Sequence, residues 1–355
     1  MPGDGLQGGS EIGGGGGPAG VDEPLDQDAA ELLLASSSPT IPGLWSSESG
    51  EMGVPMLAES GSSGLAVGID AGGSATRARA VVNGELVFDG RGGPGNPLTA
   101  DERMLAASYT TALAGCPQPD VVAACVAGAA NAEPRSRISN LLTMLFPHAA
   151  VHVHPDYVAA IQAAPADADV VVLAGTGSVV CSRMPDGAYV TSGGRGWILG
   201  DFGSATRIGR AALEWFCDDP VAAGREFATE LESLVGTRDW HEIVTAVSGA
   251  PSPAAFLARA APLLTGAAAR GENWAFQRLE IEMSPLAAQV VRHVEEHLGG
   301  REIRLVVLAG GVWQSPQAES CFRTIMARAL PRSSVIRCTL SPLEGAVRLA
   351  ESMIR

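Results

Sequence analysis

One unit occurs twice in this sequence and constrains its fold more than any other feature: a short apolar strand, a glycine-rich turn and a second strand. In the first copy, Leu65-Ala-Val-Gly-Ile69 leads into the turn Asp70-Ala-Gly-Gly-Ser-Ala-Thr76, and the strand resumes up to Val82. In the second, the apolar run 170–174 leads into Gly175-Thr-Gly-Ser178 and resumes up to Arg183. Two such hairpins, roughly a hundred residues apart, predict two domains of similar construction.

The rest of the chain alternates short apolar runs with amphipathic stretches. Buried strands are expected at 121–126, 151–153 and 303–308, and helices at 101–114, 133–146, 205–217, 239–248, 253–264, 272–298 and 343–353. This order predicts an α/β fold with two domains and a cleft between them. We place a tail at 1–63, the first domain at 64–167 plus 340–355, and the second at 168–339.

Charge and composition exclude several classes of function. The 355 residues carry a net charge of −15, which opposes binding to nucleic acid or to anionic membranes. Residues 1–63 are rich in Gly, Ser and Pro and hold ten acidic residues and no basic one, so we expect a disordered tail. With no export signal and no apolar run of 18 residues, we expect neither a membrane partner nor secretion, and a cytoplasmic location is the default.

Two residue types limit the chemistry further. All 24 basic residues are arginine, which excludes a Walker-type phosphate loop because that loop needs a lysine. The six cysteines include no C-x-x-C pair, so neither a zinc site nor a redox motif is indicated. Any nucleotide must therefore be held in another way.

The glycine turns suit a bound triphosphate. Glycines 72 and 73 let the backbone approach phosphate oxygens, Ser74 and Thr76 add hydroxyls, and Asp70 at the strand end suits a hydrated Mg²⁺. Taken alone, this stretch is equally well explained as a plain tight turn. A second turn of the same kind at 175–178 makes the functional interpretation stronger, because two opposed turns can hold a triphosphate without lysine.

Three further segments are candidates for the site. Asp156, directly after the expected strand 151–153, is placed to act as a general base, although capping the next helix explains it equally well. Asp201 lies in the glycine-rich segment 193–204 and suits sugar hydroxyls, whereas a flexible surface loop is the plainer interpretation. Gly310-Gly311 suits an adenosine or is simply a turn. His152 and His154 are not assigned to a metal.

Four of these motifs together resemble the N-acetylglucosamine kinases of the BadF/BadG family. They are Ile69-Asp-Ala-Gly-Gly-Ser-Ala-Thr-Arg77, Ala174-Gly-Thr-Gly-Ser178, Gly200-Asp-Phe-Gly-Ser204 and Leu308-Ala-Gly-Gly-Val312, and the resemblance covers roughly residues 65–352. It implies an actin-like ATPase fold, in which two RNase H-like domains close on Mg-ATP and a sugar. It also implies phosphoryl transfer to the 6-hydroxyl of N-acetylglucosamine or a related amino sugar.

The resemblance also assigns roles to residues. It implies that Asp156 is the catalytic base and that Asp70 is linked to the metal. The residues it implies for ATP are Gly72, Gly73, Ser74, Thr76, Gly175, Thr176, Gly177, Ser178, Gly310 and Gly311. The residues it implies for the sugar are Asn96, Thr176, Arg195, Gly196 and Asp201. Two positions depart from the pattern, since Phe202 stands where the family commonly has Glu, and Arg195 where some members have Trp.

Other functions remain open at this stage. Related ATPases activate 2-hydroxyacyl-CoA dehydratases through an iron–sulfur cluster, which needs cysteines at the domain boundary. Here the cysteine nearest to the second turn is Cys181, three residues beyond it. A non-catalytic sugar sensor is a further alternative, against which Asp70, Asp156 and Asp201 all argue. Relatives often form dimers, so a homodimer is possible.

Overall fold

The computed structural model describes residues 64–354. The tail predicted for residues 1–63 lies outside this range. The described residues belong to one compact unit, Glu59–Arg355. Within it, two five-stranded mixed sheets alternate with helices, and the predicted α/β class is confirmed. The domain limits near residues 167 and 339 stay predictions.

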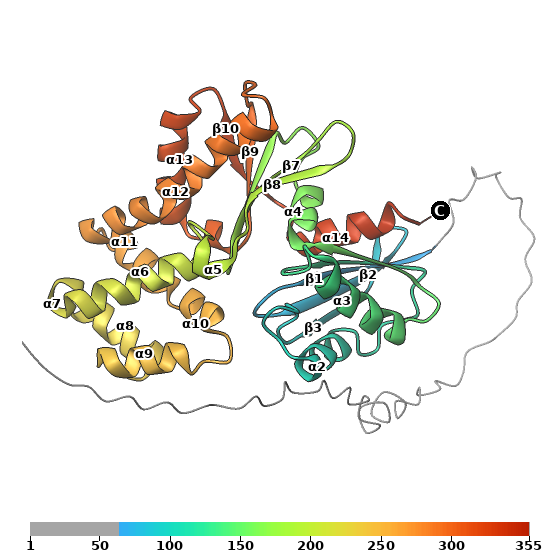
Figure 1. The fold of residues 1–355 in the computed structure, drawn as a ribbon, viewed down its shortest axis with the longest axis horizontal. Coiled ribbons are helices and arrows are strands. Elements are labelled where there is room, and N and C mark those ends of the chain that lie inside the picture. Colours follow the sequence, from blue (N-terminus) through green and yellow to red (C-terminus); the bar gives the residue numbers. More distant parts are fainter. Residues whose placement is uncertain (1–63, 355) are drawn as a thin grey trace, which may run out of the picture. The chain divides into compact units, whose positions relative to one another are not determined.

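The first sheet has the strand order β3-β2-β1-β4-β5 (Figure 1). Its strands are β1 (Leu65–Ala71), β2 (Thr76–Val82), β3 (Glu85–Gly92), β4 (Val121–Val126) and β5 (Ala150–Pro155). β1 to β3 pair antiparallel, whereas β4 and β5 continue the sheet parallel to β1. The turn between β2 and β3 is Asn83-Gly84, and both residues have positive φ, as a two-residue hairpin turn of this type requires.

Helices cover both faces of this sheet, and the alternation of side chains along β4 shows why. Val122, Ala124 and Val126 contact the core formed with α2 (Glu102–Ala112) and α3 (Ala132–Leu145). Val121, Ala123 and Cys125 face the opposite core, which includes α4 (Asp156–Ala163) and α14 (Pro342–Glu351). A strand buried on both faces needs a continuous apolar run, and all six residues of β4 are buried.

The second sheet repeats the construction of the first, with the order β10-β9-β6-β7-β8 (Figure 1). Its strands are β6 (Val170–Ala174), β7 (Ser178–Arg183), β8 (Tyr189–Gly193), β9 (Leu305–Ala309) and β10 (Ser334–Arg337). In both sheets the first three strands in sequence are antiparallel and two later strands add parallel to the first. This shared topology agrees with the similar construction predicted from the repeated hairpin, and with the RNase H-like domains that the resemblance implies.

The largest core packs helices against one face of the second sheet. The helices of this half are α5 (Gly196–Leu199), α6 (Ala205–Asp218), α7 (Pro220–Ala223), α8 (Arg225–Val235), α9 (Trp240–Ser248), α10 (Pro253–Arg259), α11 (Ala261–Ala269), α12 (Asn273–His297) and α13 (Pro316–Ala329), with a short 3₁₀ turn at Gly311–Gln314. α12 is the long helix predicted at 272–298, and it continues through Pro285.

Helix α4 contacts both sheets. Val158 and Ala159 belong to the core on the first sheet, whereas Ala160 packs with Val171 and Val307 of the second. α14 lies against α4 and β1 at very short range, because a Cβ at Gly345 would come within 2.0 Å of the Ala159 carbonyl oxygen. The last helix of the chain therefore approaches α4 closely through a glycine, while Ala346, Val347, Leu349 and Ala350 belong to the core on the first sheet.

Candidate functional site

Asp70 and Asp156 lie at the same edge of the first sheet. β1, β4 and β5 are parallel, with Ala71, Val126 and Pro155 in register. Asp70 precedes Ala71 and Asp156 follows Pro155, so the two residues lie two strands apart, about 10 Å at the usual strand spacing. The carboxyl ends of parallel strands are where open α/β sheets bind ligands.

The second and third glycine turns meet at the corresponding edge of the second sheet. β6 and β9 are parallel neighbours, with Leu173 in register with Ala309. Gly310 follows β9 with a φ of +104°, and a Cβ there would lie 2.4 Å from the carbonyl oxygen of Ala174. Glycine is thus required for the backbone after β9 to approach the start of the second turn.

The charges of Asp70 and Asp201 act on the carboxyl group of Asp156. Burial first, then the negative charge of Asp70 and, more weakly, that of Asp201, raise the pKa of Asp156 against backbone N–H groups that lower it, and the net result is a pKa of about 6. Burial also raises the pKa of Asp70, although the Arg77 guanidinium opposes this shift. Three residues from distant parts of the chain therefore form one carboxylate cluster.

Asp201 is anchored to the second turn. Its backbone has a φ of +53°, which is uncommon outside glycine. A Cβ at Gly177 would come within 2.7 Å of Asp201 Oδ2, so the carboxylate rests directly on that glycine. Burial raises the pKa of Asp201, while hydrogen bonds from the backbone of Ser178 and Gly196 lower it. Asp201 thereby connects the segment 193–204 to the second turn.

The first turn presents an open backbone. The N–H of Gly72 donates to the Ala75 carbonyl at 2.9 Å, and a Cβ at Gly72 or Gly73 would have no neighbour within 4 Å. Ser74 is exposed beside them. Thr76 differs, since it is fully buried and its Oγ1 has no hydrogen-bond partner among residues 64–354. Its hydroxyl does not share the exposed side of the turn.

Hydrogen bonds from the start of helix α6 hold the second turn in place. Ala205 N–H donates to the Gly175 carbonyl at 2.8 Å, and the Thr206 hydroxyl donates to the Thr176 carbonyl at 2.6 Å. The Ser178 hydroxyl donates to the Phe202 carbonyl at 2.7 Å. These bonds occupy the carbonyl groups, while the space beside Gly175 and Gly311 is open. The hydrogen bond from Thr206 to the second turn was not predicted. The position of this threonine in the first helical turn after Ser204 could have indicated it.

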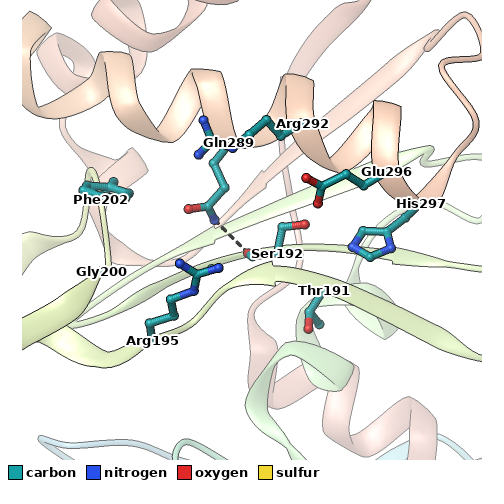
Figure 2. A pocket seen from close by; sticks show the side chains of 10 residues that line it. Thr191, Ser192, Arg195, Gly200, Phe202, Gln289, Arg292, Glu296 and His297 are labelled. Atoms are coloured by element: carbon teal, nitrogen blue, oxygen red, sulfur yellow. Dashed lines mark hydrogen bonds between the residues drawn. The ribbon is translucent and has the colours of Figure 1, made fainter.

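The remaining sugar candidates do not all join the cluster. Asn96 accepts from the Leu98 N–H at 2.9 Å and lies against Gly128, where a Cβ would come within 2.3 Å of its Oδ1, just beyond β4. Gly196 contacts Asp201 through its backbone. Arg195 is exposed and lines a pocket of about 480 Å³ with Phe202 (Figure 2). This pocket adjoins Gly200 and Phe202, whereas the Asp201 carboxylate rests on Gly177.

Phe202, where the resemblance leads us to expect a carboxylate, makes contacts of another kind. Its ring packs on the second core, and the guanidinium of Arg207 lies 5.6 Å from the ring centroid. Arg207 in turn pairs with the buried Glu282 at 3.0 Å. The sequence carried no signal for this Phe202, Arg207 and Glu282 arrangement.

The site fits a magnesium nucleotide better than a protein-bound metal. Within residues 64–354, no three His, Cys, Asp or Glu side chains are grouped as a metal site. Mg²⁺ with ATP needs few protein ligands, because it keeps several waters and takes phosphate oxygens. The Asp70 carboxylate beside the open glycines of the first turn meets this requirement. In the same part of the chain, no helix is long and apolar enough to cross a membrane.

A family model described as the BadF/BadG/BcrA/BcrD ATPase family matches residues 67–350. No curated protein matches the sequence. A candidate N-acetylglucosamine kinase from Chromobacterium violaceum is 22% identical, with a TM-score of 0.63 over 81% of this chain and 99% of that one.

Two further solved structures are similar. A candidate N-acetylglucosamine kinase from Porphyromonas gingivalis is 18% identical, with a TM-score of 0.66 over 81% of this chain and 99% of that one. A ROK family glucokinase from Streptomyces griseus, in complex with glucose and AMPPNP, is 17% identical, with a TM-score of 0.57 over 81% of this chain and 100% of that one. At these identities the similarity establishes the fold.

Proposed function

Because the chain belongs to the BadF/BadG/BcrA/BcrD ATPase family, we propose that it is an ATP-dependent kinase that phosphorylates the 6-hydroxyl of N-acetylglucosamine or a related amino sugar. The observation that carries this proposal is the carboxylate cluster, in which the pKa of Asp156 is raised to about 6. A carboxylate with a pKa close to neutral pH is a stronger base than an ordinary aspartate and is still largely ionised at pH 7.

In this proposal Asp156 would accept the proton of the sugar 6-hydroxyl as the hydroxyl oxygen bonds to the γ-phosphorus of ATP. The bond from that phosphorus to the β–γ bridging oxygen would break, and ADP would leave. Asp156 begins α4, and the backbone N–H groups of its own residue and of Tyr157 lower the pKa of its carboxyl group. Its position directly after β5 puts this residue at the carboxyl edge of the sheet. Phosphoryl transfer asks little covalent chemistry of the protein, so positioning this base supplies much of what the reaction requires.

The glycine turns would hold the nucleotide. Bound Mg-ATP supplies the phosphoryl group, and its metal ion offsets phosphate charge. The space beside Gly72, Gly73 and Gly175 is open, so phosphate oxygens would be able to approach this backbone without any lysine. The N–H groups of Gly72 and Gly175 already donate to the Ala75 and Gly177 carbonyls, which leaves the Gly73 N–H as the donor that this proposal uses. Asp70 would contact the metal through its water shell, and Gly311, also open, would lie beside the adenosine.

The sugar would be held mainly by Asp201, with Thr176, Gly196 and Asn96 nearby. Asp201 can accept hydrogen bonds from two adjacent sugar hydroxyls because N–H groups of Ser178 and Gly196 already orient it. Arg195 stays a predicted contact of the sugar. Phe202 packs away on the second core and not with Asp201, which supports a sugar site in which Asp201 acts without a second carboxylate.

The thiols favour a kinase over a dehydratase activator. An iron–sulfur cluster needs accessible thiolates. Cys181 is fully buried, its Sγ contacts the Val171 carbonyl oxygen at 3.5 Å, and burial together with the charge of Asp156 raises the pKa of its thiol. Such a thiol is poorly suited to bind iron.

A coupled ADP-release assay tests the proposal. Mg-ATP would be offered with N-acetylglucosamine, glucosamine, N-acetylmuramate, N-acetylmannosamine or glucose, and we expect turnover with at least one amino sugar. Asp156→Asn should lower kcat by about 10²- to 10⁴-fold because the base is lost. Asp186→Asn, in the exposed β7–β8 turn, is the matched control and should be as active as the wild type. Full turnover in Asp156→Asn, or ADP release that no sugar stimulates, would contradict the proposal.

A further inference from the structure

The pocket beside Arg195 lies outside the carboxylate cluster. It encloses about 480 Å³ between the end of β8 and the second half of α12, a volume within the usual range for small-molecule sites (Figure 2). Its lining is strongly polar and consists of Thr191, Ser192, Gly193, Arg195, Gly200, Phe202, Gln289, Arg292, Glu296 and His297.

Two guanidinium groups enter this pocket from different elements. Arg195 reaches it from the segment after β8 and Arg292 from α12, and both side chains extend toward Gln289 (Figure 2). In the described range 64–354, neither guanidinium forms a salt bridge. Arg207, by contrast, pairs with Glu282 of α12. The pocket lining contains two arginines and one carboxylate, Glu296, so its net charge is positive although the whole protein has a net charge of −15.

The wall formed by β8 is fixed in place before any ligand arrives. Gln289 Nε2 donates to the Ser192 carbonyl at 2.7 Å, and Gly193 leaves room for this amide, since a Cβ there would come within 2.1 Å of it. Among the described residues β8 is the edge strand of its sheet, and its last residues, 191–193, line the pocket. A preformed site loses less entropy when it binds a ligand.

A buried histidine behind this wall fixes it further. Ser182 Oγ must donate to the Asp169 carbonyl at 2.7 Å, so it accepts from His293 Nε2, 2.9 Å away. The neutral ring then accepts from Ser192 Oγ through Nδ1, also at 2.9 Å. Burial, with a smaller effect of His297, lowers the pKa of His293 to about 4, which agrees with a neutral ring. The chain of bonds connects α12 to β7 and β8.

We propose that this pocket binds a small phosphate monoester, with its phosphate between Arg195 and Arg292 and its hydroxyls toward Glu296 and Gln289. The planar fork of a guanidinium matches two phosphate oxygens, and a dianionic phosphate offsets the charges of the two arginines that line the pocket. The volume exceeds the needs of a bare anion and leaves room for a polyol. A carboxylate would use the same guanidinium chemistry, so the test includes one.

Isothermal titration calorimetry tests the proposal. Glucose 6-phosphate, inorganic phosphate and citrate would each be titrated into the full chain, with Mg-ADP and N-acetylglucosamine present to occupy the proposed catalytic site. We expect saturable binding of glucose 6-phosphate, weaker binding of inorganic phosphate, and still weaker binding of citrate. Arg292→Gln should weaken the binding of glucose 6-phosphate at least about tenfold, because a charge-assisted hydrogen-bond pair is lost.

Arg278→Gln is the matched control on the same helix. Its guanidinium lies 4.8 Å from the Trp215 ring centroid, outside this pocket, so glucose 6-phosphate should bind this variant as it binds the wild type. Binding that both Arg195→Gln and Arg292→Gln retain would place the phosphate elsewhere and overturn the proposal. Citrate that binds more tightly than glucose 6-phosphate would overturn the ligand class, and no heat from any of the three with folded protein would overturn the site.

Discussion

At the scale of single residues, Asp156 has the most informative environment. The usual pKa of an aspartate is 3.8, and burial together with the charges of Asp70 and Asp201 raises that of Asp156 to about 6. Asp70 and Asp201 therefore disfavour the ionisation of Asp156. A site of this kind gains from a bound cation, because positive charge relieves the repulsion among them.

The raised pKa predicts a pH dependence. If Asp156 must be ionised to accept the proton, kcat/KM should rise about tenfold per pH unit below pH 6 and become level above it. The measurement is a pH–rate profile of kcat/KM, which reports on the free enzyme, between about pH 5 and pH 8. Asp186→Asn should show the same profile. A level profile throughout that range would mean that no group with this pKa controls the reaction.

Alanine substitutions at two glycines of the second turn should affect different substrates, one the KM for the sugar and the other the KM for ATP. In Gly177→Ala the new methyl group would press on the Asp201 carboxylate at 2.7 Å, so the KM for the sugar should rise by about tenfold, with a smaller change for ATP. In Gly175→Ala the methyl enters open space where we place phosphate, so the KM for ATP should rise instead. Steady-state kinetics with each substrate varied in turn would measure both. Equal effects on the two substrates in both variants would contradict this assignment.

At the scale of elements, the packing of α14 predicts a stability difference between two helix-interior glycines. Gly345→Ala should destabilise the protein by about 2 kcal/mol or more, because the methyl group would collide with the backbone of Ala159 in α4. Gly266→Ala in α11 is the control, since its methyl would have no neighbour closer than 3.6 Å. That change should stabilise the helix by up to about 1 kcal/mol. Urea unfolding followed by circular dichroism measures both, and equal stabilities would show that α14 does not pack as described.

The sequence predicted some elements near their observed limits and missed others, among them the amphipathic helices α8 and α13 and two strands that are largely exposed or half-buried. β4 is a continuous apolar run and α12 has a long amphipathic period, and both were expected near their observed limits. β3 was not expected, because its side chains are mostly exposed, although Asn83-Gly84 is a strong hairpin signal. β8 was missed as well, since all five of its residues are half-buried and give no alternation.

At the scale of the whole molecule, the sequence predicted the glycine turns and aspartates of the candidate site but not which of them contact one another. Glycine turns and aspartates at strand ends can be recognised locally, because turns and strand limits have local signals. That Asp201 rests on Gly177 depends on the tertiary fold. The pocket beside Arg195 is lined by β8 and by a helix about a hundred residues later in the chain. No local sequence signal distinguishes Arg292 from an ordinary surface arginine.

The position of α4 has a consequence for how substrates enter and leave. A kinase of the proposed kind would exclude water by moving one half of the molecule against the other. α4 contacts both sheets and starts with Asp156, so we expect such a rotation to pivot near it. Points at a pivot are displaced least, and the phosphate turns, farther along each sheet edge, would travel more. The molecule could then open for product release while its base keeps nearly the same place and surroundings.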